Sequence, residues 1–386
     1  MGVLKSRFRL AGVFTSLILG FVVILALVSN LSANALAANI TVSAREANGL
    51  FPISDEITTT SQITLTAVAS DTLLYFPLIF KPVPTPELLA IPRPNSGNQW
   101  TVSWNAIDGT AVTYELEEDS SDDFLSPGFY ANGASLSRAF SHGASIDNSY
   151  CYRVRAAIGG QRSDWSNVEC VVGAYYDDMS SSSSGWAIRQ EDTDDANNET
   201  YYKDGNMVLK IHGRWDFSVA SPLRPAPEPP YEIRSRIRLN KPDNLNSYGL
   251  IFGGDWNGTT CPNGDFNSCF NHYYRLNIIW YGSKNNLRVR LKRIDYHDEK
   301  EGNAGRGVGL TDYFSVKVGS PPEKYVEWRV RVLENGTINI YVNDNLVKSV
   351  TDSTYINGPY FGVFAATDEY LGSEPWVDWY SVTPLD

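Results

Sequence analysis

Short runs in which apolar and polar residues alternate dominate the chain beyond residue 86. In the first run, Trp100, Val102 and Trp104 are separated by polar residues, and longer runs of the same kind occupy 231–239 and 287–291. Alternation with a period of two is typical of strands that bury one face and expose the other. From Trp186 to the C-terminus no stretch has a convincing helical period, so the pattern predicts an all-β protein.

Turn signals divide the predicted strands into two groups. Asp108-Gly109 and Gly159-Gly160 interrupt the first group, and Asn335-Gly336 separates two strands of the second. Glycine-containing pairs of this kind favour tight hairpin turns. We expect a small antiparallel sandwich over 86–173 and a larger double-sheet sandwich, or jelly roll, over 174–386.

The first 38 residues have a different pattern. Three basic residues among the first nine precede the apolar run Leu10–Val28, and small residues follow at Ala33–Ala38. This order is typical of a signal peptide, which predicts a secreted or cell-surface protein that loses residues 1–38. The run of 19 residues is also long enough to cross a bilayer as a helix. An uncleaved signal anchor is therefore the alternative, and membrane contact is expected only through this segment.

Residues 39–85 are rich in Thr, Ser and Pro. They contain two short apolar pieces, 63–68 and 73–80, and a proline cluster begins at Pro82. Two short strands cannot close a hydrophobic core by themselves, and a proline-rich segment is stiff. We interpret 39–85 as a Thr/Pro-rich tether with one or two marginal strands.

The four cysteines form two close pairs along the sequence. Cys151 and Cys170 lie 19 positions apart in a strand-rich stretch, and Cys261 and Cys269 lie 8 apart across turn residues. No C-x-x-C spacing and no histidine at ligand spacing accompanies them, which argues against zinc. Four cysteines allow three pairings, and proximity favours Cys151 with Cys170 and Cys261 with Cys269 in an oxidising compartment.

Composition narrows the classes of function. The chain has 386 residues, 42% hydrophobic, with a formal charge of -12, which excludes a mainly disordered or collagen-like protein. The acidic balance also argues against nucleic-acid binding. Loss of residues 1–38 would change the charge from -12 to -15. In contrast, Tyr231–Arg331 contains 16 Lys or Arg against 11 Asp or Glu, a local charge of +5.

Eight arginines at predicted outward positions contribute to this local charge. They are Arg234, Arg236, Arg238, Arg275, Arg288, Arg290, Arg329 and Arg331. On one sheet they would form a surface of guanidinium groups, which pair well with carboxylate or sulfate. That arrangement predicts an anionic polysaccharide as the ligand. The alternative is a solvated face whose arginines pair with acidic neighbours across strands.

Aromatic residues in 253–281 are candidates for a sugar-binding surface, because sugars stack on exposed rings beside polar groups. Trp256 lies between Asp255 and Asn257 in a predicted loop, and Tyr273 shares its strand face with polar neighbours. Tyr274 and Trp280 have the parity of the apolar positions and are expected in the core. The predicted ligand-binding residues are Trp256, Tyr273, Arg275, Asn277, Tyr281, Arg288 and Arg290.

Four segments of the small sandwich occur in a recognisable order: W-T-V-S-W at 100–104, Y-E-L-E at 114–117, Y-C-Y-R-V-R-A at 150–156 and G-G-Q-R-S-D-W-S at 159–166. With them, residues 86–173 resemble a fibronectin type III domain. The resemblance implies a spacer with Trp104 and Tyr152 as core anchors and Tyr150 as the corner tyrosine. A cysteine pair on the last two strands is uncommon in that family.

Eight short segments characterise the larger region: Gly185-Trp186, Tyr202-x-Asp204-Gly205-x-Met207, Tyr248-Gly249-Leu250-Ile251-Phe252, Tyr273-Tyr274-x-Leu276, Trp328-x-Val330, Ile340-Tyr341-Val342-Asn343, Phe361-Gly362-Val363 and Val377-Asp378. With them, residues 174–386 resemble the concanavalin A-like, laminin G-like superfamily of secreted β-sandwiches. Its members include carbohydrate-binding modules, adhesion domains and some glycosidases. The resemblance implies glycan binding, with adhesion to another protein as the alternative.

A glycosidase is a third interpretation. Glycoside hydrolysis needs two carboxylates across the scissile bond, and the glycosidases that this region resembles carry them as E-x-D-x-x-E, a string absent from 176–386. No G-x-S-x-G motif supports a serine nucleophile either. We therefore expect a non-catalytic protein, although carboxylates on separate strands would escape such a search.

The second resemblance also implies a structural calcium ion where the first and last strands meet. Calcium is held by six to eight oxygens from carboxylates and carbonyls. The candidate ligands are Asp177, Asp178, a carbonyl near Gly205, and Asp378. The alternative is that these acidic residues are solvated at strand ends.

Overall fold

The computed structural model describes residues 64–69, 72–77, 81–186, 190–193, 196–213, 217–240, 246–256, 270–280, 286–295, 307–318, 323–367 and 372–386. In these residues the chain forms strands β1 to β25 and one short 3-10 helix, Ser182–Ser184. The prediction of an all-β protein is confirmed. Within the same ranges, no helix is both long and apolar enough to span a membrane. The predicted signal at 1–38 lies outside the described residues.

The chain divides into two compact units. One comprises Met1–Pro86, Ile107–Thr113 and Arg155–Asp164, and the other Glu87–Ala106, Tyr114–Val154 and Trp165–Asp386. In the first unit, β1 (Thr64–Ala69) and β2 (Thr72–Pro77) form an antiparallel hairpin. The two apolar pieces of the tether are therefore strands. The domain boundaries at 38, 85 and 173 stay predictions.

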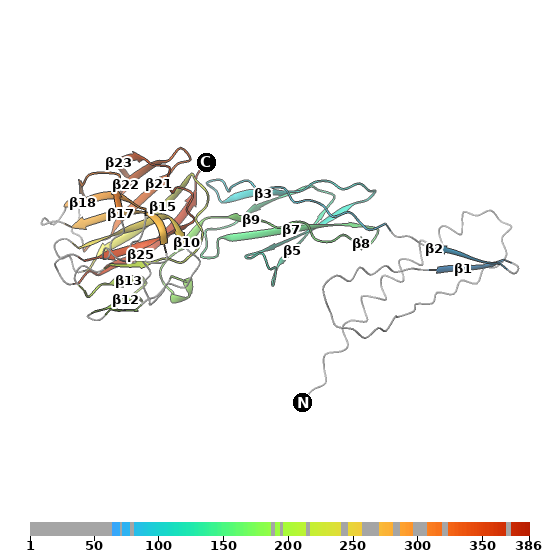
Figure 1. The fold of residues 1–386 in the computed structure, drawn as a ribbon, viewed down its shortest axis with the longest axis horizontal. Coiled ribbons are helices and arrows are strands. Elements are labelled where there is room, and N and C mark those ends of the chain that lie inside the picture. Colours follow the sequence, from blue (N-terminus) through green and yellow to red (C-terminus); the bar gives the residue numbers. More distant parts are fainter. Residues whose placement is uncertain are drawn as a thin grey trace, which may run out of the picture. The chain divides into compact units, whose positions relative to one another are not determined.

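Two small sheets follow the proline cluster (Figure 1). One pairs β3 (Gln99–Ser103) with β6 (Ser137–Ser141); the other contains β5 (Gly128–Gly133), β4 (Thr113–Asp119), β7 (Ser149–Ile158), β8 (Gln161–Arg162) and β9 (Glu169–Val172). Their alternating apolar residues meet around the buried ring of Tyr152. The Tyr152 hydroxyl donates to Glu118 Oε2 at 2.6 Å and accepts from Trp100 Nε1 at 3.0 Å. The buried Tyr152 hydroxyl and the Trp100 indole N–H are thus both hydrogen-bonded.

The first predicted disulfide is confirmed. Cys151 on β7 and Cys170 on β9 lie directly opposite each other and are joined through their sulfurs. Trp104 and Tyr152, the anchors implied by the first resemblance, are both buried. The predicted Cys261–Cys269 pair lies outside the described residues.

A nine-stranded sheet forms one layer of the larger sandwich. Its order is β11 (Gln190–Thr193), β12 (Ala196–Lys203), β13 (Asn206–Lys210), β25 (Pro375–Pro384), β15 (Tyr231–Leu239), β21 (Val326–Val332), β22 (Thr337–Val342) and β23 (Asn345–Thr351), with β10 (Tyr175–Asp177) also paired to β25. The first and last strands of the region therefore meet in this sheet, through β10 and β25.

A seven-stranded sheet forms the other layer. Its order is β14 (Phe217–Ala220), β24 (Tyr360–Ala366), β16 (Ser247–Trp256), β17 (Phe270–Trp280), β18 (Asn286–Ile294) and β19 (Gly307–Gly309), with β20 (Phe314–Lys317) also paired to β18. The pairs β16–β17 and β17–β18 are antiparallel over most of their length. Each sheet has an inner face, which packs against the other sheet, and an outer face.

The hydrophobic core lies between the two sheets. Ile233 and Val330 of the nine-stranded sheet share one buried cluster with Leu276 and Val289 of the seven-stranded sheet. Along β15, β18 and β21 these buried positions alternate with more exposed ones. If one strand shifted by one residue along its neighbour, its buried side chains would move to the outer face. Burial of each large aliphatic side chain stabilises the fold by about 1.5–3 kcal/mol, so such a shift is strongly unfavourable. The alternation in the sequence therefore fixes the register.

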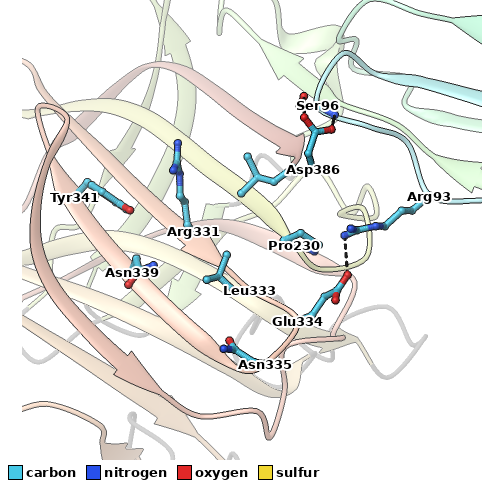
Figure 2. A pocket seen from close by; sticks show the side chains of 11 residues that line it. Arg93, Ser96, Pro230, Arg331, Leu333, Glu334, Asn335, Asn339, Tyr341 and Asp386 are labelled. Carbon is cyan, nitrogen blue, oxygen red and sulfur yellow. Dashed lines mark hydrogen bonds and ion pairs between the residues drawn. The ribbon is translucent and has the colours of Figure 1, made fainter.

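A pocket of about 580 Å³ opens on the outer face of the nine-stranded sheet (Figure 2). Its floor includes Arg331 on β21 with Asn339 and Tyr341 on β22, and its rim includes Arg93 and Ser96. We refer to it as the β21–β22 pocket. It lies on the opposite layer of the sandwich from most of the predicted ligand-binding residues.

Candidate functional site

Five of the predicted ligand-binding residues share the outer face of the seven-stranded sheet. This face carries Tyr273, Arg275 and Asn277 of β17 and Arg288, Arg290 and Lys292 of β18. In the register, Arg275 lies opposite Lys292 and Asn277 lies opposite Arg290. Side chains directly opposite each other in antiparallel strands are about 5 Å apart at Cβ. The pairing therefore brings three cations and an amide together, and we call Arg275, Arg290 and Lys292 the cation cluster.

The degree of exposure on β17 differs from the prediction. Tyr273, Arg275 and Asn277 were expected on an exposed surface, but each is only 5% exposed. The reason is a second apolar cluster on this face, in which Tyr273 packs with Phe217 and Phe364 among others. Strand parity separates two faces but does not reveal that both are covered. These three side chains lie beneath the surface.

Arg275 is held by polar and aromatic contacts. Its Nε donates to Asn277 Oδ1 at 2.8 Å, and its guanidinium carbon lies 5.2 Å from the ring centres of both Phe217 and Phe364. Ring faces attract a cation, more strongly where water is excluded. Burial nevertheless lowers the pKa of the Arg275 guanidinium, because removal from water penalises its charged form.

The pKa of Lys292 reflects its burial beside two other cations. Burial, and to a smaller extent the nearby charges of Arg275 and Arg290, together lower the pKa of its ammonium to about 8. All three causes disfavour the protonated form. No acidic side chain among the described residues raises the pKa of Lys292.

Arg290 lies at the border between the buried and exposed parts of this face. Its Nε donates to the Thr311 carbonyl at 3.2 Å, and its guanidinium carbon is 5.3 Å from the ring centre of Tyr313. Gly309 on β19 makes room for it, since a Cβ there would lie 2.0 Å from Arg290 Nη2. Tyr313 is 45% exposed. The cluster thus reaches solvent beside an accessible aromatic ring.

The cation cluster has no ion pair with an acid in the described part of the chain. Arg275 and Arg290 bond to an amide and a carbonyl, which carry no full charge. Like charges directly opposite each other destabilise a sheet, and their repulsion grows as water is excluded. An anion is the ligand that would relieve this repulsion.

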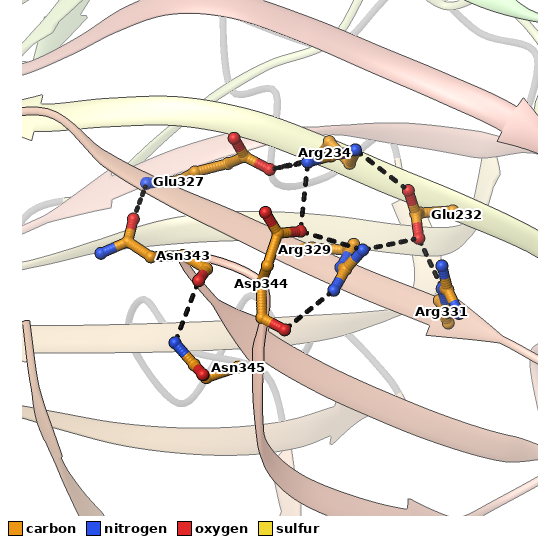
Figure 3. A network of polar contacts seen from close by, with 8 residues as sticks. All are labelled: Glu232, Arg234, Glu327, Arg329, Arg331, Asn343, Asp344 and Asn345. Carbon is orange, nitrogen blue, oxygen red and sulfur yellow. Dashed lines mark hydrogen bonds and ion pairs between the residues drawn. The ribbon is translucent and has the colours of Figure 1, made fainter.

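The outer face of the nine-stranded sheet has a different electrostatic design, centred on Glu232 (Figure 3). Glu232 Oε2 accepts from Arg331 Nε at 2.5 Å and lies 3.6 Å from Arg329 Nη1, while Glu232 Oε1 lies 3.8 Å from Arg234 Nη1. Three guanidinium groups thus converge on one buried carboxylate.

Two further acids complete this network. Arg234 Nε donates to Glu327 Oε1 at 2.8 Å, and Arg329 Nη1 lies 3.1 Å from Asp344 Oδ1. Arg329 also lies over the Tyr341 ring, 4.1 Å from its centre. Within this group three arginines face three acids, and we call it the ion-pair network.

The prediction of eight arginines on one sheet is wrong. Five of them, Arg234, Arg236, Arg238, Arg329 and Arg331, lie on the nine-stranded sheet, whereas Arg275, Arg288 and Arg290 lie on the seven-stranded sheet. The alternative of pairing across strands describes four arginines of the first sheet, including Arg236, which pairs with Asp378. Arg238 instead lies over the rings of Tyr325 and Trp376. Parity along each strand could not show which sheet the strand would join.

The proposed calcium ligands do not fit a calcium ion as they are arranged. Asp177 is buried, and its two oxygens accept from Met179 N at 2.8 Å and Trp186 Nε1 at 2.7 Å. Asp378 pairs with Arg236, whereas Asp178 accepts from the neighbouring Ser180 N and Gly205 stands in the β12–β13 turn. Among the described residues, no group of three or more His, Cys, Asp or Glu could hold a metal ion.

Two predicted ligand-binding aromatics have side chains outside the described residues. Trp256 is the last residue of β16, but its side chain, like the whole of Tyr281, lies outside the described residues. Of the predicted core aromatics, Tyr274 is fully buried and Trp280 packs against the main cluster.

Sequence reasoning missed two residues of this face. Lys292 has the same parity as Arg288 and Arg290, so it could have been included from the alternation alone. Tyr313 gave no such signal, because only the pairing of β18 with β20 brings its neighbourhood to Arg290.

No family model and no curated protein matches the chain. Solved structures similar to its C-terminal part include LamAcat from Zobellia galactanivorans, with 10% identity, 54% of this chain and 96% of that chain covered, and a TM-score of 0.36. The VIP36 exoplasmic/lumenal domain in a Ca²⁺/Man2-bound form has 12% identity, coverage of 53% and 84%, and a TM-score of 0.35.

The Emp46p carbohydrate recognition domain in a potassium-bound form has 14% identity, covers 54% of this chain and 93% of its own, and has a TM-score of 0.36. The calcium, potassium and sugar belong to those proteins. At these identities and TM-scores the likenesses assign neither a family nor a ligand to this chain.

Proposed function

We propose that the chain is an exported, non-catalytic protein that binds an anionic polysaccharide through the outer face of the seven-stranded sheet. The observation that carries this proposal is the cation cluster, in which Arg275, Arg290 and Lys292 adjoin without an acidic partner among the described residues. Carboxylate and sulfate groups pair bidentately with guanidinium and would offset the repulsion.

The ligand would contact the accessible part of this face. Arg288 is exposed, Arg290 and Lys292 are partly buried, and Tyr313 offers a ring beside Arg290. The polymer's anionic groups would meet Arg290 and Lys292, and the apolar side of a sugar would stack on Tyr313. Arg275 and Asn277 lie beneath this surface and would not touch the ligand. Arg275 would add to the positive potential, and Asn277 would hold its guanidinium in position.

The rest of the chain fits a role outside the cytoplasm. The export signal at 1–38 would direct secretion or anchorage, and the disulfide Cys151–Cys170 accords with an oxidising compartment. Residues 86–173 would serve as a fibronectin type III-like spacer that carries the binding sandwich away from the tether.

Binding to three polymers of matched length tests the proposal: dextran sulfate, alginate and neutral dextran. The wild type should bind the two anionic polymers and not dextran, and Arg290→Ala/Lys292→Ala should weaken binding at least about tenfold, as expected for two charge-assisted contacts. A Lys203→Ala/Lys324→Ala protein removes the same charge from the other side of the sandwich and should bind as the wild type does.

Equal binding by all three proteins would overturn the assignment of this face. Binding to poly-glutamate but to neither anionic polysaccharide would instead favour the alternative function, adhesion to an acidic protein.

A further inference from the structure

The β21–β22 pocket has the dimensions of a small-molecule site. Its volume is about 580 Å³, and sites for small ligands commonly enclose 300–1,000 Å³. The floor is rigid, because Arg331 and Asn339 lie directly opposite each other in the β21–β22 ladder. The cavity therefore rests on paired strands.

Two interactions fix the rim. Arg93 Nη1 lies 3.1 Å from Glu334 Oε1, and the backbone nitrogen and hydroxyl of Ser96 both donate to the Asp386 carboxylate, at 2.9 and 2.6 Å (Figure 2). Arg93 and Glu334 neutralise each other, whereas the Asp386 carboxylate is held by neutral donors and keeps its negative charge. Arg331 on the floor is likewise paired, with Glu232.

The two amide side chains of the pocket, Asn335 and Asn339, have hydrogen-bonding groups to spare. Asn339 has no side-chain hydrogen bond among the described residues, and Asn335 uses only its Oδ1, which accepts from Thr337 N at 2.9 Å. An amide has two donors and two acceptor positions. Both side chains line the pocket close to Leu333 (Figure 2).

Apolar and aromatic surface lies beside these amides. Leu333 and Pro230 contribute to the wall, and Tyr341 contributes a ring and a hydroxyl. A wall of this kind suits the C–H face of a sugar, whereas free amides suit its hydroxyl groups. Both cations of the pocket, Arg93 and Arg331, are already paired with carboxylates, and the unpaired Asp386 carboxylate would repel an anionic ligand.

We propose that the β21–β22 pocket binds a neutral saccharide of one or two residues, held by Asn335 and Asn339 against Tyr341 and Leu333. This second site is separate from the cation cluster, for which we propose an anionic ligand on the other sheet. A polymer that carries both neutral and anionic sugars would be bound at two places by one sandwich.

Saturation-transfer NMR on the full exported chain tests the site with glucose, galactose, mannose, maltose and cellobiose at concentrations up to 50 mM. At least one sugar should bind, and Asn339→Leu should weaken it about five- to tenfold, as expected for the loss of one or two neutral hydrogen bonds. Asn345→Ala is the matched control, because it removes an exposed amide from β23 and should leave binding unchanged.

A second variant guards against misfolding of the first. Leu333→Glu places an unpaired charge on the wall and should also abolish binding, while the melting temperature shows whether each variant is folded. No binding by any of the five sugars, or binding that survives both substitutions, would overturn the proposal. Dextran sulfate binding at the other sheet should be unaffected by either variant. The experiment can therefore contradict the saccharide site without contradicting the proposed anion-binding site.

Discussion

The two outer faces of the larger sandwich use the same kind of side chain in opposite ways. On the nine-stranded sheet, Arg234, Arg329 and Arg331 share Glu232, Glu327 and Asp344. On the seven-stranded sheet, the cation cluster has no acidic partner among the described residues. The ion-pair network is neutral by internal pairing, whereas the cation cluster keeps a positive charge that costs stability.

This difference separates structural from functional arginines. A paired arginine contributes to the sheet that carries it, and removal of its acid leaves an uncompensated charge. An unpaired, half-buried cation is retained at a cost, which is typical of sites that bind a ligand. The following predictions test whether the two faces differ in this way.

The largest effect is expected from Glu232→Gln. Glu232 is 7% exposed and lies at the centre of three guanidinium groups. Loss of its charge should lower the free energy of unfolding by about 3 kcal/mol, the low end of the scale for breaking a buried ion pair, because the arginines are partly exposed. Urea unfolding measures it, and a loss below about 0.5 kcal/mol would show that the ion-pair network does not stabilise the sheet.

The opposite sign is expected from Lys292→Met. This substitution keeps the length of the side chain and removes the repulsion with Arg275 and Arg290. The free energy of unfolding at pH 7 should rise by about 0.5–1 kcal/mol, the scale of opposed like charges. Destabilisation would mean that the Lys292 charge is compensated in the folded protein, contrary to the comparison.

A pH dependence follows from the same residue. The folded pKa of about 8 lies below the ordinary value of 10.5, so the unfolded chain binds more protons between these two values. Stability should therefore rise with pH across that window, and affinity for a sulfated polymer should fall as Lys292 loses its charge. The difference between wild type and Lys292→Met, by urea unfolding from pH 7.5 to 10, isolates this contribution.

The smallest effect is expected from Gly309→Ala. A Cβ at this position would lie 2.0 Å from Arg290 Nη2, at the far end of a flexible side chain. The guanidinium should shift without loss of the fold, and affinity for dextran sulfate should fall about two- to threefold, less than one full hydrogen bond. Unchanged affinity would place Arg290 outside the binding surface.

The sequence predicted the type of structure well, because each strand carries its own evidence. Alternation along 231–239 and 287–291 identified strands and buried faces, and proximity identified the Cys151–Cys170 disulfide. Assignment of strands to sheets is a property of distant pairs. Nothing in β15 or β18 alone shows that Arg234 and Arg290 lie on different layers.

The candidate site was predicted only in part for the same reason. The parity of β17 placed Tyr273, Arg275 and Asn277 on one face, but not beneath Phe217 and Phe364, which come from β14 and β24. The β21–β22 pocket had no local signal, since its walls are distant in the sequence.

The central claim is that the cation cluster on the seven-stranded sheet is a binding site for an anionic ligand. An NMR titration of the Lys292 ammonium, with and without saturating dextran sulfate, tests it most directly. The account predicts a pKa near 8 in the free protein and a clear rise when the polyanion is bound, because an adjacent negative charge favours the protonated form. A pKa close to 10.5 in the free protein, or one that bound polyanion leaves unchanged, would contradict the account.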